Sequence, residues 1–189
     1  MKKYILPSIK LTVVLLIICS VLYPLLVAAF GHFSPGNGKG TTETVNGKVV
    51  GYSLIGQKFD QDKYFWSRPS AVAFNAAGSA GSNKGPTNPD YLKDVQTKID
   101  SFLVHNPGVR KEDVPAELVT YSGSGLDPDI SPRAAYVQIA RIAKVRNIPE
   151  EQIKTLVDQH IEKSLLGILG PEKVNVLKLN IDLDKQGAK

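Results

Sequence analysis

The feature that most constrains this chain is an apolar run near its N-terminus, residues 11–30, which contains no charged residue. A helix of this length, at about 1.5 Å per residue, is about 30 Å long, the thickness of the hydrocarbon core of a bilayer. Thr12 and Ser20 interrupt the run, but each hydroxyl can bond to a carbonyl of its own helix. The run therefore predicts one transmembrane helix.

Three lysines precede this run and predict how the helix is oriented. Lys2, Lys3 and Lys10 are charged, and no residue among the first ten is acidic. Positively charged flanks stay on the cytoplasmic side of a membrane. We therefore expect residues 1–10 to lie in the cytoplasm, the chain to cross the cell membrane once, and residues 31–189 to be extracytoplasmic.

A cleaved signal peptide is the alternative interpretation of the same run. Its apolar core would be residues 11–22, and Val27, Ala28 and Ala29 offer small residues for cleavage. The apolar stretch continues to Phe30, however, which is longer than the core of a usual signal peptide. This length favours an uncleaved anchor, whereas cleavage would release a secreted domain.

The remainder of the chain has a mixed and solvated composition. The whole chain carries a net charge of +5, and the N-terminal lysines account for +3 of it, so that residues 31–189 carry +2. Such a balance is not that of a nucleic-acid-binding surface. Cys19 is the single cysteine and lies in the apolar run, so no intrachain disulfide can form and the exported part has no cysteine nucleophile.

Glycine and polar residues divide the exported part into a connector and a domain. Residues 31–47 contain five glycines and are expected to be a flexible linker. Residues 48–189 are enough for one domain with a hydrophobic core. Within this domain, residues 57–89 form a long stretch with little periodicity, and the aromatic residues 64–66 predict that part of it is packed.

The domain is expected to be α+β, with about three helices packed on a small sheet. The predicted helices begin near Asn88, Ser131 and Pro149, at capping residues or an acidic first turn. The predicted strands, marked by glycine boundaries or by apolar alternation, are residues 48–56, 118–121 and 174–183.

The sequence contains no recognisable catalytic set and no metal site. His32, His105 and His160 do not have the spacing of metal ligands. A membrane-anchored hydrolase that uses Ser122 or Ser124 with a histidine base is an alternative function. Neither serine lies in a nucleophile-elbow motif, which speaks against it.

The glycine-rich residues 122–125 are similar to a phosphate-binding loop but fail its specific forms. The lysine of a P-loop is missing, and Pro128 stands where a dinucleotide fingerprint needs glycine. Asp127 and Asp129 could bind a cation, yet no third ligand is near them in the sequence. We interpret this region as a strand-to-helix turn in which the aspartates cap the backbone.

Two further polar residues have more than one interpretation. Gln138 lies at the margin of an apolar helix face, where its amide must be satisfied by a neighbouring loop, a ligand or a partner. Arg68 could stack on Tyr64 or Trp66, or pair with a carboxylate. Both are candidates for a structural or an interfacial role.

Many ordered motifs over nearly the whole chain resemble one family, the C subunit of the Kdp high-affinity potassium-transporting P-type ATPase. The densest matches lie between residues 114 and 147. The matching residues include Tyr23-Pro24-Leu25, Leu54-Ile55-Gly56-Gln57, Tyr64-Phe65, Arg68-Pro69-Ser70-Ala71, Gly81-Ser82-Asn83, Leu118-Val119-Thr120, Ser124-Gly125-Leu126-Asp127, Gln138, Arg141, Val174-Asn175-Val176 and Leu179-Asn180.

The resemblance implies a non-catalytic accessory subunit of an ATP-driven potassium uptake complex. Its partners would be a channel-like subunit that carries potassium and a P-type subunit that hydrolyses ATP. The family's C subunit is described as a catalytic chaperone that raises the ATP affinity of the P-type subunit. A glutamine matching Gln138 is proposed there to help hold the nucleotide, so Gln138 is a nucleotide-binding candidate by resemblance. The partner or loop candidates are Arg68, Ser122, Ser124 and Asp127.

The predicted topology conflicts with direct nucleotide contact, because an extracytoplasmic domain cannot touch cytoplasmic ATP. We therefore expect no cofactor bound by the chain itself and an effect on ATP that reaches the P-type subunit through the complex. The alternative function is a membrane-anchored or secreted extracytoplasmic binding module unrelated to transport.

Overall fold

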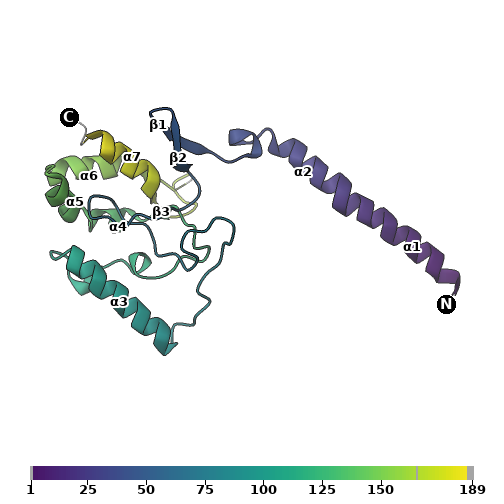
Figure 1. Cartoon of the computed structure of the whole chain (residues 1–189), viewed down its shortest axis with the longest axis horizontal. Coiled ribbons are helices and arrows are strands. Elements are labelled where there is room, and N and C mark those ends of the chain that lie inside the picture. The colour runs from purple at the N-terminus through teal and green to yellow at the C-terminus, as the bar shows by residue number, and fades with distance from the viewer. Residues whose placement is uncertain (1, 165, 187–189) are drawn as a thin grey trace. The chain divides into compact units, whose positions relative to one another are not determined.

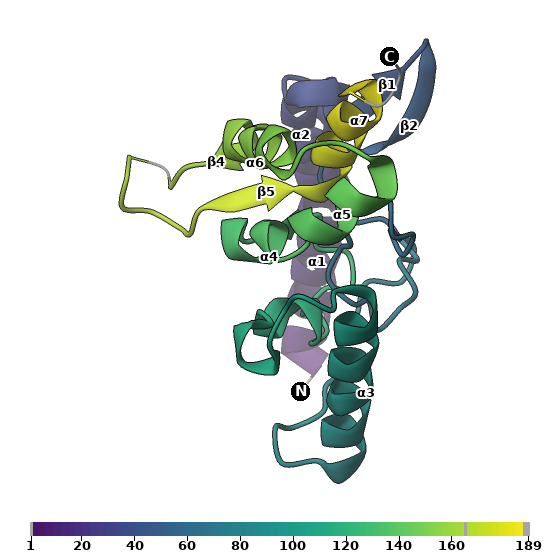
Figure 2. The same cartoon turned by 90° about the vertical axis from the view of Figure 1, so that its left-hand side faces the viewer.

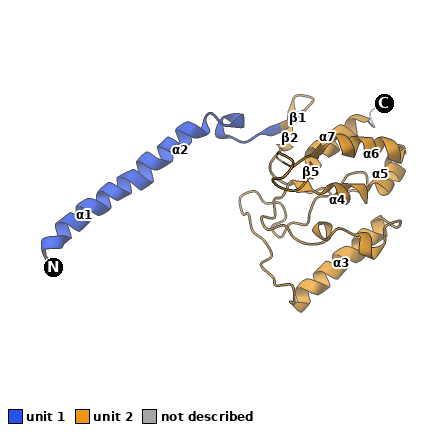
Figure 3. Ribbon diagram, turned by 180° about the vertical axis from the view of Figure 1, so that it is seen from behind, with its two compact units in different colours: residues 1–42 blue, residues 43–189 orange. Residues whose placement is uncertain are grey.

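The computed structural model describes residues 2–164 and 166–186 and divides the chain into two compact units. The first unit comprises residues 1–42, and the second comprises residues 43–189 (Figure 3). The first is almost entirely helical, and the second contains helices and short strands. The chain therefore has one N-terminal apolar helix followed by a mixed helix-and-sheet domain, as the sequence predicted.

The N-terminal helix is continuous from the first described residues to Gly31 (Figure 1). It consists of α1 (Lys2–Ile17), a π-helical turn (Ile18–Leu22) and α2 (Tyr23–Gly31). The 29 residues Lys3–Gly31 are long and apolar enough to cross a membrane, and their apolar side chains are exposed. The helix includes the predicted residues 11–30 and begins earlier.

The π-helical turn lies immediately before Pro24, which explains its position. Proline has no N–H, so the carbonyl of Ser20 lacks its usual helical donor four residues later. The N–H of Tyr23 bonds to the carbonyl of Ile18, five residues earlier instead of four. A proline thus changes the hydrogen-bond register locally without ending the helix.

A β-hairpin follows the N-terminal helix. After a 3-10 turn (Pro35–Gly38), strand β1 (Thr42–Val45) pairs with β2 (Lys48–Tyr52). The two connecting residues, Asn46 and Gly47, both have positive φ, at 50° and 77°. Asn-Gly in this conformation is the preferred two-residue hairpin turn. The segment expected to be a flexible linker therefore contains a strand, while the predicted strand at residues 48–56 ends at Tyr52.

The predicted helix starts of the second unit are confirmed. The Asn88 side chain accepts a bond from the N–H of Tyr91 at 3.0 Å, and Ser131 Oγ accepts one from the N–H of Ala134 at 3.1 Å. The second predicted helix is in fact two, because the chain breaks at residues 137–138. The helices are α3 (Pro89–His105), α4 (Pro132–Tyr136), α5 (Ile139–Arg146), α6 (Glu150–Gln159) and α7 (Val176–Gln186).

The described strands of the domain core form an antiparallel three-stranded sheet with the order β3-β5-β4. They are β3 (Asp129–Ile130), β4 (Ile161–Glu162) and β5 (Lys173–Asn175). In the register, Val174 of the central strand lies opposite Ile130 on one side and Ile161 on the other. In Figure 2, β5 runs between α4 and α6, so the sheet is covered by helices.

The predicted strand at residues 118–121 is wrong. Residues Ala116–Leu118 form a 3-10 turn instead, and Thr120 Oγ1 donates back to the carbonyl of Ala116 at 2.8 Å. Leu118 and Val119 are adjacent and both buried, which a half-buried strand would not allow because its neighbours face opposite sides. A short apolar run does not distinguish a strand from a buried turn.

The predicted strand at residues 174–183 is also wrong beyond its first two residues. Asn175 ends β5, and its Oδ1 accepts a bond from the N–H of Lys178 at 3.1 Å, so that helix α7 follows directly. Val176, Leu179 and Leu183 are buried. Their spacing of three and four residues fits one face of a helix, which the apparent alternation with polar residues concealed.

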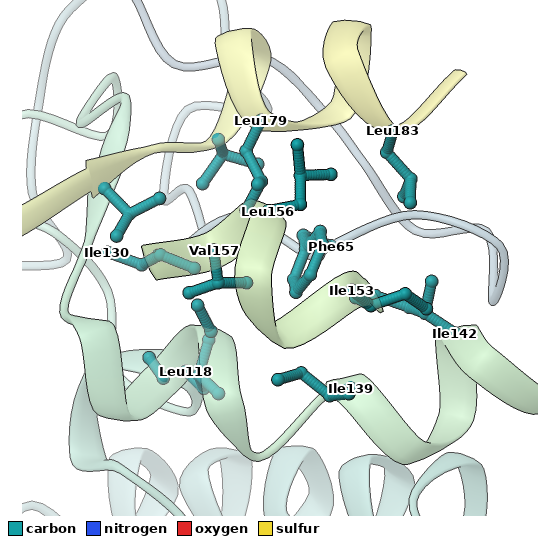
Figure 4. Close-up of a cluster of buried hydrophobic side chains, with 14 of the residues drawn as sticks. Phe65, Leu118, Ile130, Ile139, Ile142, Ile153, Leu156, Val157, Leu179 and Leu183 are labelled. Carbon is teal, nitrogen blue, oxygen red and sulfur yellow. The ribbon is translucent and has the colours of Figure 1, made fainter. Parts of the chain in front are cut away.

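The hydrophobic core lies between the sheet and helices α4 to α7. Figure 4 shows Phe65, from the long loop before α3, among apolar side chains of this core. On α6, the buried side chains are those of Ile153, Leu156 and Val157, whose spacing fits one face of a helix. Helix α3 contributes less to the core, because Phe102 is its one buried residue and Leu92 is exposed.

Candidate functional site

Buried polar side chains of the domain gather around residues 62–66, which we call the clamped segment. The segment belongs to the long loop before α3 and contains the fully buried Phe65. Three buried polar residues bond to its backbone: Gln138 between α4 and α5, Arg141 on α5, and Asn180 on α7. Together they form a buried polar cluster around this segment.

Gln138 is fully buried, and both ends of its amide have partners inside the domain. Its Oε1 accepts bonds from the N–H of Trp66 at 2.8 Å and from Arg141 Nη2 at 2.7 Å. Its Nε2 donates to the carbonyl of Ala134 at 3.0 Å. Gln138 thus bonds to a neighbouring loop, which is one of the three partners that the sequence analysis considered for its amide.

Arg141 carries a buried positive charge. Its Nη1 donates to the carbonyls of Asp62 and Tyr64, at 2.6 Å and 3.0 Å, and its Nε donates to Asn106 Oδ1 at 3.0 Å. Its guanidinium lies 4.6 Å from the centre of the Trp66 ring. Burial lowers the pKa of Arg141 to about 10, with the Asp62 carboxylate opposing this shift, so the side chain is charged at neutral pH.

Asn180 holds the clamped segment from the opposite helix. Its Oδ1 accepts the N–H of Phe65 at 2.9 Å, and its Nδ2 donates to the carbonyl of the same residue at 3.0 Å. An asparagine side chain thus pairs with one residue as a neighbouring strand would. The backbone polar groups of a buried loop are satisfied in this way, and the Phe65 ring can enter the core.

The glycine-rich residues 122–127, which we call the glycine loop, pack against two other loops. Gly56 donates its N–H to the carbonyl of Leu126 at 2.7 Å, and Ser70 Oγ donates to the carbonyl of Gly125 at 2.6 Å. Gly125 has φ of 68°, and a Cβ there would lie 2.6 Å from Val72 Cγ2. The glycines therefore permit close packing of loops, as expected of a turn.

Arg68 and Asp127 form an ion pair that ties the clamped segment's loop to the glycine loop. Arg68 Nη1 donates to Asp127 Oδ2 at 2.7 Å, and the two side chains are 24% and 29% exposed. The other carboxylate oxygen accepts the N–H of Asp129 at 3.1 Å. Asp127 thus has the capping role that the sequence analysis considered for it, and it is also the carboxylate partner that the analysis considered for Arg68.

The serines of the glycine loop have no histidine partner among the described residues. Ser122 is buried, and its Oγ has no hydrogen-bond partner there. Ser124 Oγ accepts the N–H of Leu126 at 3.1 Å. His105 lies 2.8 Å from the Asp62 carboxylate and His160 lies 3.0 Å from that of Asp182, so each is paired elsewhere.

No metal site is present in the described part of the chain. It contains no group of three histidine, cysteine, aspartate or glutamate residues placed to hold an ion.

Of the site residues predicted from the sequence, the structure brings Arg68 and Asp127 into contact. Gln138 bonds to Trp66, two residues before Arg68.

A groove of about 680 Å³ lies next to Arg141 on the outside of the domain. It runs between the end of α3 and helices α4 and α5 and is mostly apolar. The lining side chains include Val104, Pro107, Val109, Val137, Ala140 and Val145. Such a concave apolar surface is the usual form of a ligand or partner site.

Arg141 and Asn180 were named only among the residues that carry the family resemblance, and neither was given a role. Arg141 follows Gln138 by three residues, a spacing that places two side chains on one helix face, and this was the available signal. Asn180 was assigned to a strand, where its polar side chain would alternate outward. Its burial depends on α7, which the sequence pattern did not reveal.

We expect Gly56→Ala to lower the free energy of unfolding by about 1–3 kcal/mol, because an added Cβ would lie 2.5 Å from the carbonyl oxygen of Asp127. Gly85→Ala is the matched control, since nothing lies within 4 Å of a Cβ there. Urea unfolding of the two variants measures the difference. Equal stability of the two would show that the contact between the loops is not close.

Comparison with known proteins gives one consistent result. The family model described as "K+-transporting ATPase, c chain" (KdpC) matches residues 5–185. Two similar proteins, both named potassium-transporting ATPase KdpC subunit, come from Flavobacterium johnsoniae and Bacteroides fragilis. The first is 55% identical over 176 residues, covering 93% of this chain and 94% of its own. The second is 52% identical over 186 residues, covering 97% of each chain.

A more distant relative of the same name comes from Caldanaerobacter subterraneus subsp. tengcongensis. It is 46% identical over 177 residues, covering 93% of this chain and 92% of its own. All three alignments thus cover more than nine-tenths of this chain.

Proposed function

The chain belongs to the KdpC family of potassium-transporting ATPase subunits, and from this we propose that it is a non-catalytic accessory subunit of an ATP-driven, high-affinity potassium uptake complex. The match over residues 5–185 carries the proposal. Its partners in the proposal are a channel-like subunit that carries potassium and a P-type subunit that hydrolyses ATP. The apolar helix anchors it beside them in the cell membrane.

We further propose that the N-terminus is cytoplasmic and the domain extracytoplasmic. The support is the charge asymmetry around the helix, with Lys2, Lys3 and Lys10 before it and no acidic residue among the first thirty. In this orientation ATP and the domain are on opposite sides of the membrane. The subunit therefore stabilises the complex and promotes ATP use by the P-type subunit indirectly, as a catalytic chaperone acting through its partners.

The surroundings of Gln138 support an indirect role for this residue. Its side chain is fully buried, and its amide oxygen already accepts two bonds, from Trp66 and Arg141. A nucleotide would have to displace these bonds and leave buried groups unpaired, which costs free energy. We propose that Gln138 positions the clamped segment, and that the surface loops around Arg68 and Asp127 face the partner subunits.

Co-purification tests the proposed function. The tagged full-length chain would be purified in a mild detergent from cells starved of potassium. We expect two larger membrane proteins in stoichiometric amounts, with potassium-stimulated ATPase activity. Recovery of the chain alone, whether full length or cut after Ala29, would contradict the proposal and favour a free-standing binding module.

We also predict that the full-length chain alone, in detergent at physiological salt, binds ATP no more tightly than millimolar. The reason is that Gln138, the nucleotide-binding candidate given by the resemblance, has both ends of its amide bonded inside the domain. Isothermal titration with ATP measures this, with Gln138→Ala as the comparison variant. Micromolar binding by the wild type that is lost in Gln138→Ala would overturn the indirect role.

A further inference from the structure

The connection between β4 and β5 projects from the domain as a long loop (Figure 2). Among its described residues, three aliphatic side chains are exposed, those of Leu166, Ile168 and Leu169, which we call the apolar tip. They are 82%, 82% and 56% exposed. Exposed apolar residues that stand singly are common on protein surfaces, but a cluster of this kind marks an interaction site.

The backbone of the loop has positive φ at three described residues. Leu166 has φ of 56°, in the left-handed region that bulky residues seldom adopt. Gly167 and Gly170 also have positive φ, at 75° and 84°, and the N–H of Gly167 donates to the carbonyl of Ser164 at 2.9 Å. A leucine in this conformation costs conformational energy, which points to a use for its exposed side chain.

Charged residues flank the apolar tip on both sides in the sequence, but the tip itself has no charged residue. Glu162 and Lys163 precede the loop, and Glu172 and Lys173 follow it, whereas residues 166–171 carry no charge. At the base, Lys173 Nζ lies 2.7 Å from the carboxylate of Asp129 and 3.4 Å from that of Glu162. The loop therefore has an apolar end and a polar, internally paired base, as an element at a membrane interface has.

The composition of the tip fits lipid better than protein. Protein interfaces gain most of their binding energy from tryptophan, tyrosine and arginine, whereas leucine is under-represented among their dominant residues. The tip consists of two leucines and one isoleucine, next to Gly167 and Gly170. Aliphatic side chains need no specific partner in order to leave water, so a bilayer surface satisfies them fully.

The length of the connector keeps a membrane within reach of the domain. Helix α2 ends at Gly31 and β1 begins at Thr42, so the chain between them spans at most about 35–40 Å. A domain of this size has a radius of gyration of about 15 Å, hence a width of about 40 Å. With the helix in the bilayer, the connector therefore keeps Thr42, where the domain is attached, within about 40 Å of the end of the helix.

We propose that the apolar tip inserts into the interfacial layer of the bilayer, giving the chain a second membrane contact besides its helix. This contact would restrict the rotation of the domain on its connector. The inference depends on the apolar helix being embedded in a membrane. It does not depend on the proposed role in potassium uptake.

The test places an environment-sensitive fluorophore at position 168 of the full-length chain. The variant is Ile168→Cys in a Cys19→Ser background, reconstituted in phosphatidylcholine vesicles with or without doxyl-labelled lipid. Lys154→Cys, on an exposed turn of α6, is the matched control. We expect a blue-shifted emission that doxyl lipid quenches at position 168, and a water-like, unquenched emission at position 154.

A second variant shows whether the tip itself causes the insertion. Adding Leu166→Ser and Leu169→Ser to the labelled chain should reduce the quenching at position 168 about threefold or more, because two apolar anchors are lost. Unchanged quenching would overturn the proposal. A water-like emission of the original label at position 168 would also overturn it, as would a blue shift that doxyl lipid does not quench, since the latter places the tip against protein.

Discussion

Replacement of Arg141 by alanine is expected to lower the free energy of unfolding by about 3 kcal/mol or more. The carbonyls of Asp62 and Tyr64 and the amide oxygen of Asn106 would each lose a charged donor. These groups lie in or beside the interior, where an unpaired polar atom is costly. A domain of this size has a total stability of about 5–15 kcal/mol, so the loss would be a large part of it.

Urea unfolding of the full-length chain in detergent, followed by the fluorescence of Trp66, measures this loss. Trp66 is the single tryptophan, and its ring lies against the Arg141 guanidinium, so it reports the clamped segment directly. Arg133→Ala is the matched control, because Arg133 is exposed and has one long hydrogen bond, 3.3 Å, to the carbonyl of Asp113. Equal losses in the two variants would contradict the account.

Arg141→Lys separates the effect of charge from that of geometry. Lysine retains the charge but lacks the planar fork with which arginine reaches several acceptors at once. We therefore expect a stability between those of the wild type and Arg141→Ala. Full stability of Arg141→Lys would show that charge alone, and not the set of hydrogen bonds, holds the clamped segment.

Phe65→Ala is expected to lower the free energy of unfolding by about 3–5 kcal/mol, through lost apolar burial and the cavity that remains. Phe65 is completely buried, with 0% of its surface exposed, and it packs in the hydrophobic core. Its backbone is fixed by both ends of the Asn180 amide, so the loop cannot easily collapse into the space. The cost should therefore lie toward the upper end of this range.

The same unfolding experiment tests this prediction, with Phe33→Ala as the matched control. Phe33 is 88% exposed and lies outside the domain core, so its loss should change stability by about 0.5 kcal/mol or less. A small effect of Phe65→Ala would mean that the clamped segment is not part of the folded core in solution.

The helices were predictable because their signals are local. Asn88 and Ser131 each precede a proline and accept a bond from the N–H three residues later, so residue type alone marks the start. The apolar spacing of α6 likewise identifies its buried face. The N-terminal helix was predictable from length and lack of charge.

The strands were harder because they are short and depend on distant partners. Strand β3 has two residues, and it exists through pairing with β5, more than forty residues away. The residues after Asn175 satisfy both an alternating and a helical spacing, and only packing decides between them. Tertiary contacts overrule a local pattern in such cases.

The candidate site was predictable in part. The ion pair of Arg68 was anticipated as one option, but its partner Asp127 is 59 residues away and no local rule links the two. Gln138 was identified as a polar residue that needs a partner. Its partners, Trp66 and Arg141, became apparent only when the long loop was seen to enter the core.

The central claim, that this chain is an accessory subunit on which the pump depends, is tested most directly by potassium-stimulated ATPase activity. The activity would be measured over a range of ATP concentrations for complexes purified from potassium-starved cells with and without the chain. The account predicts that activity is lost without the chain, returns when the wild-type chain is supplied, and is absent from the chain alone. The same activity and ATP dependence without the chain, or hydrolysis by the chain alone, would contradict it.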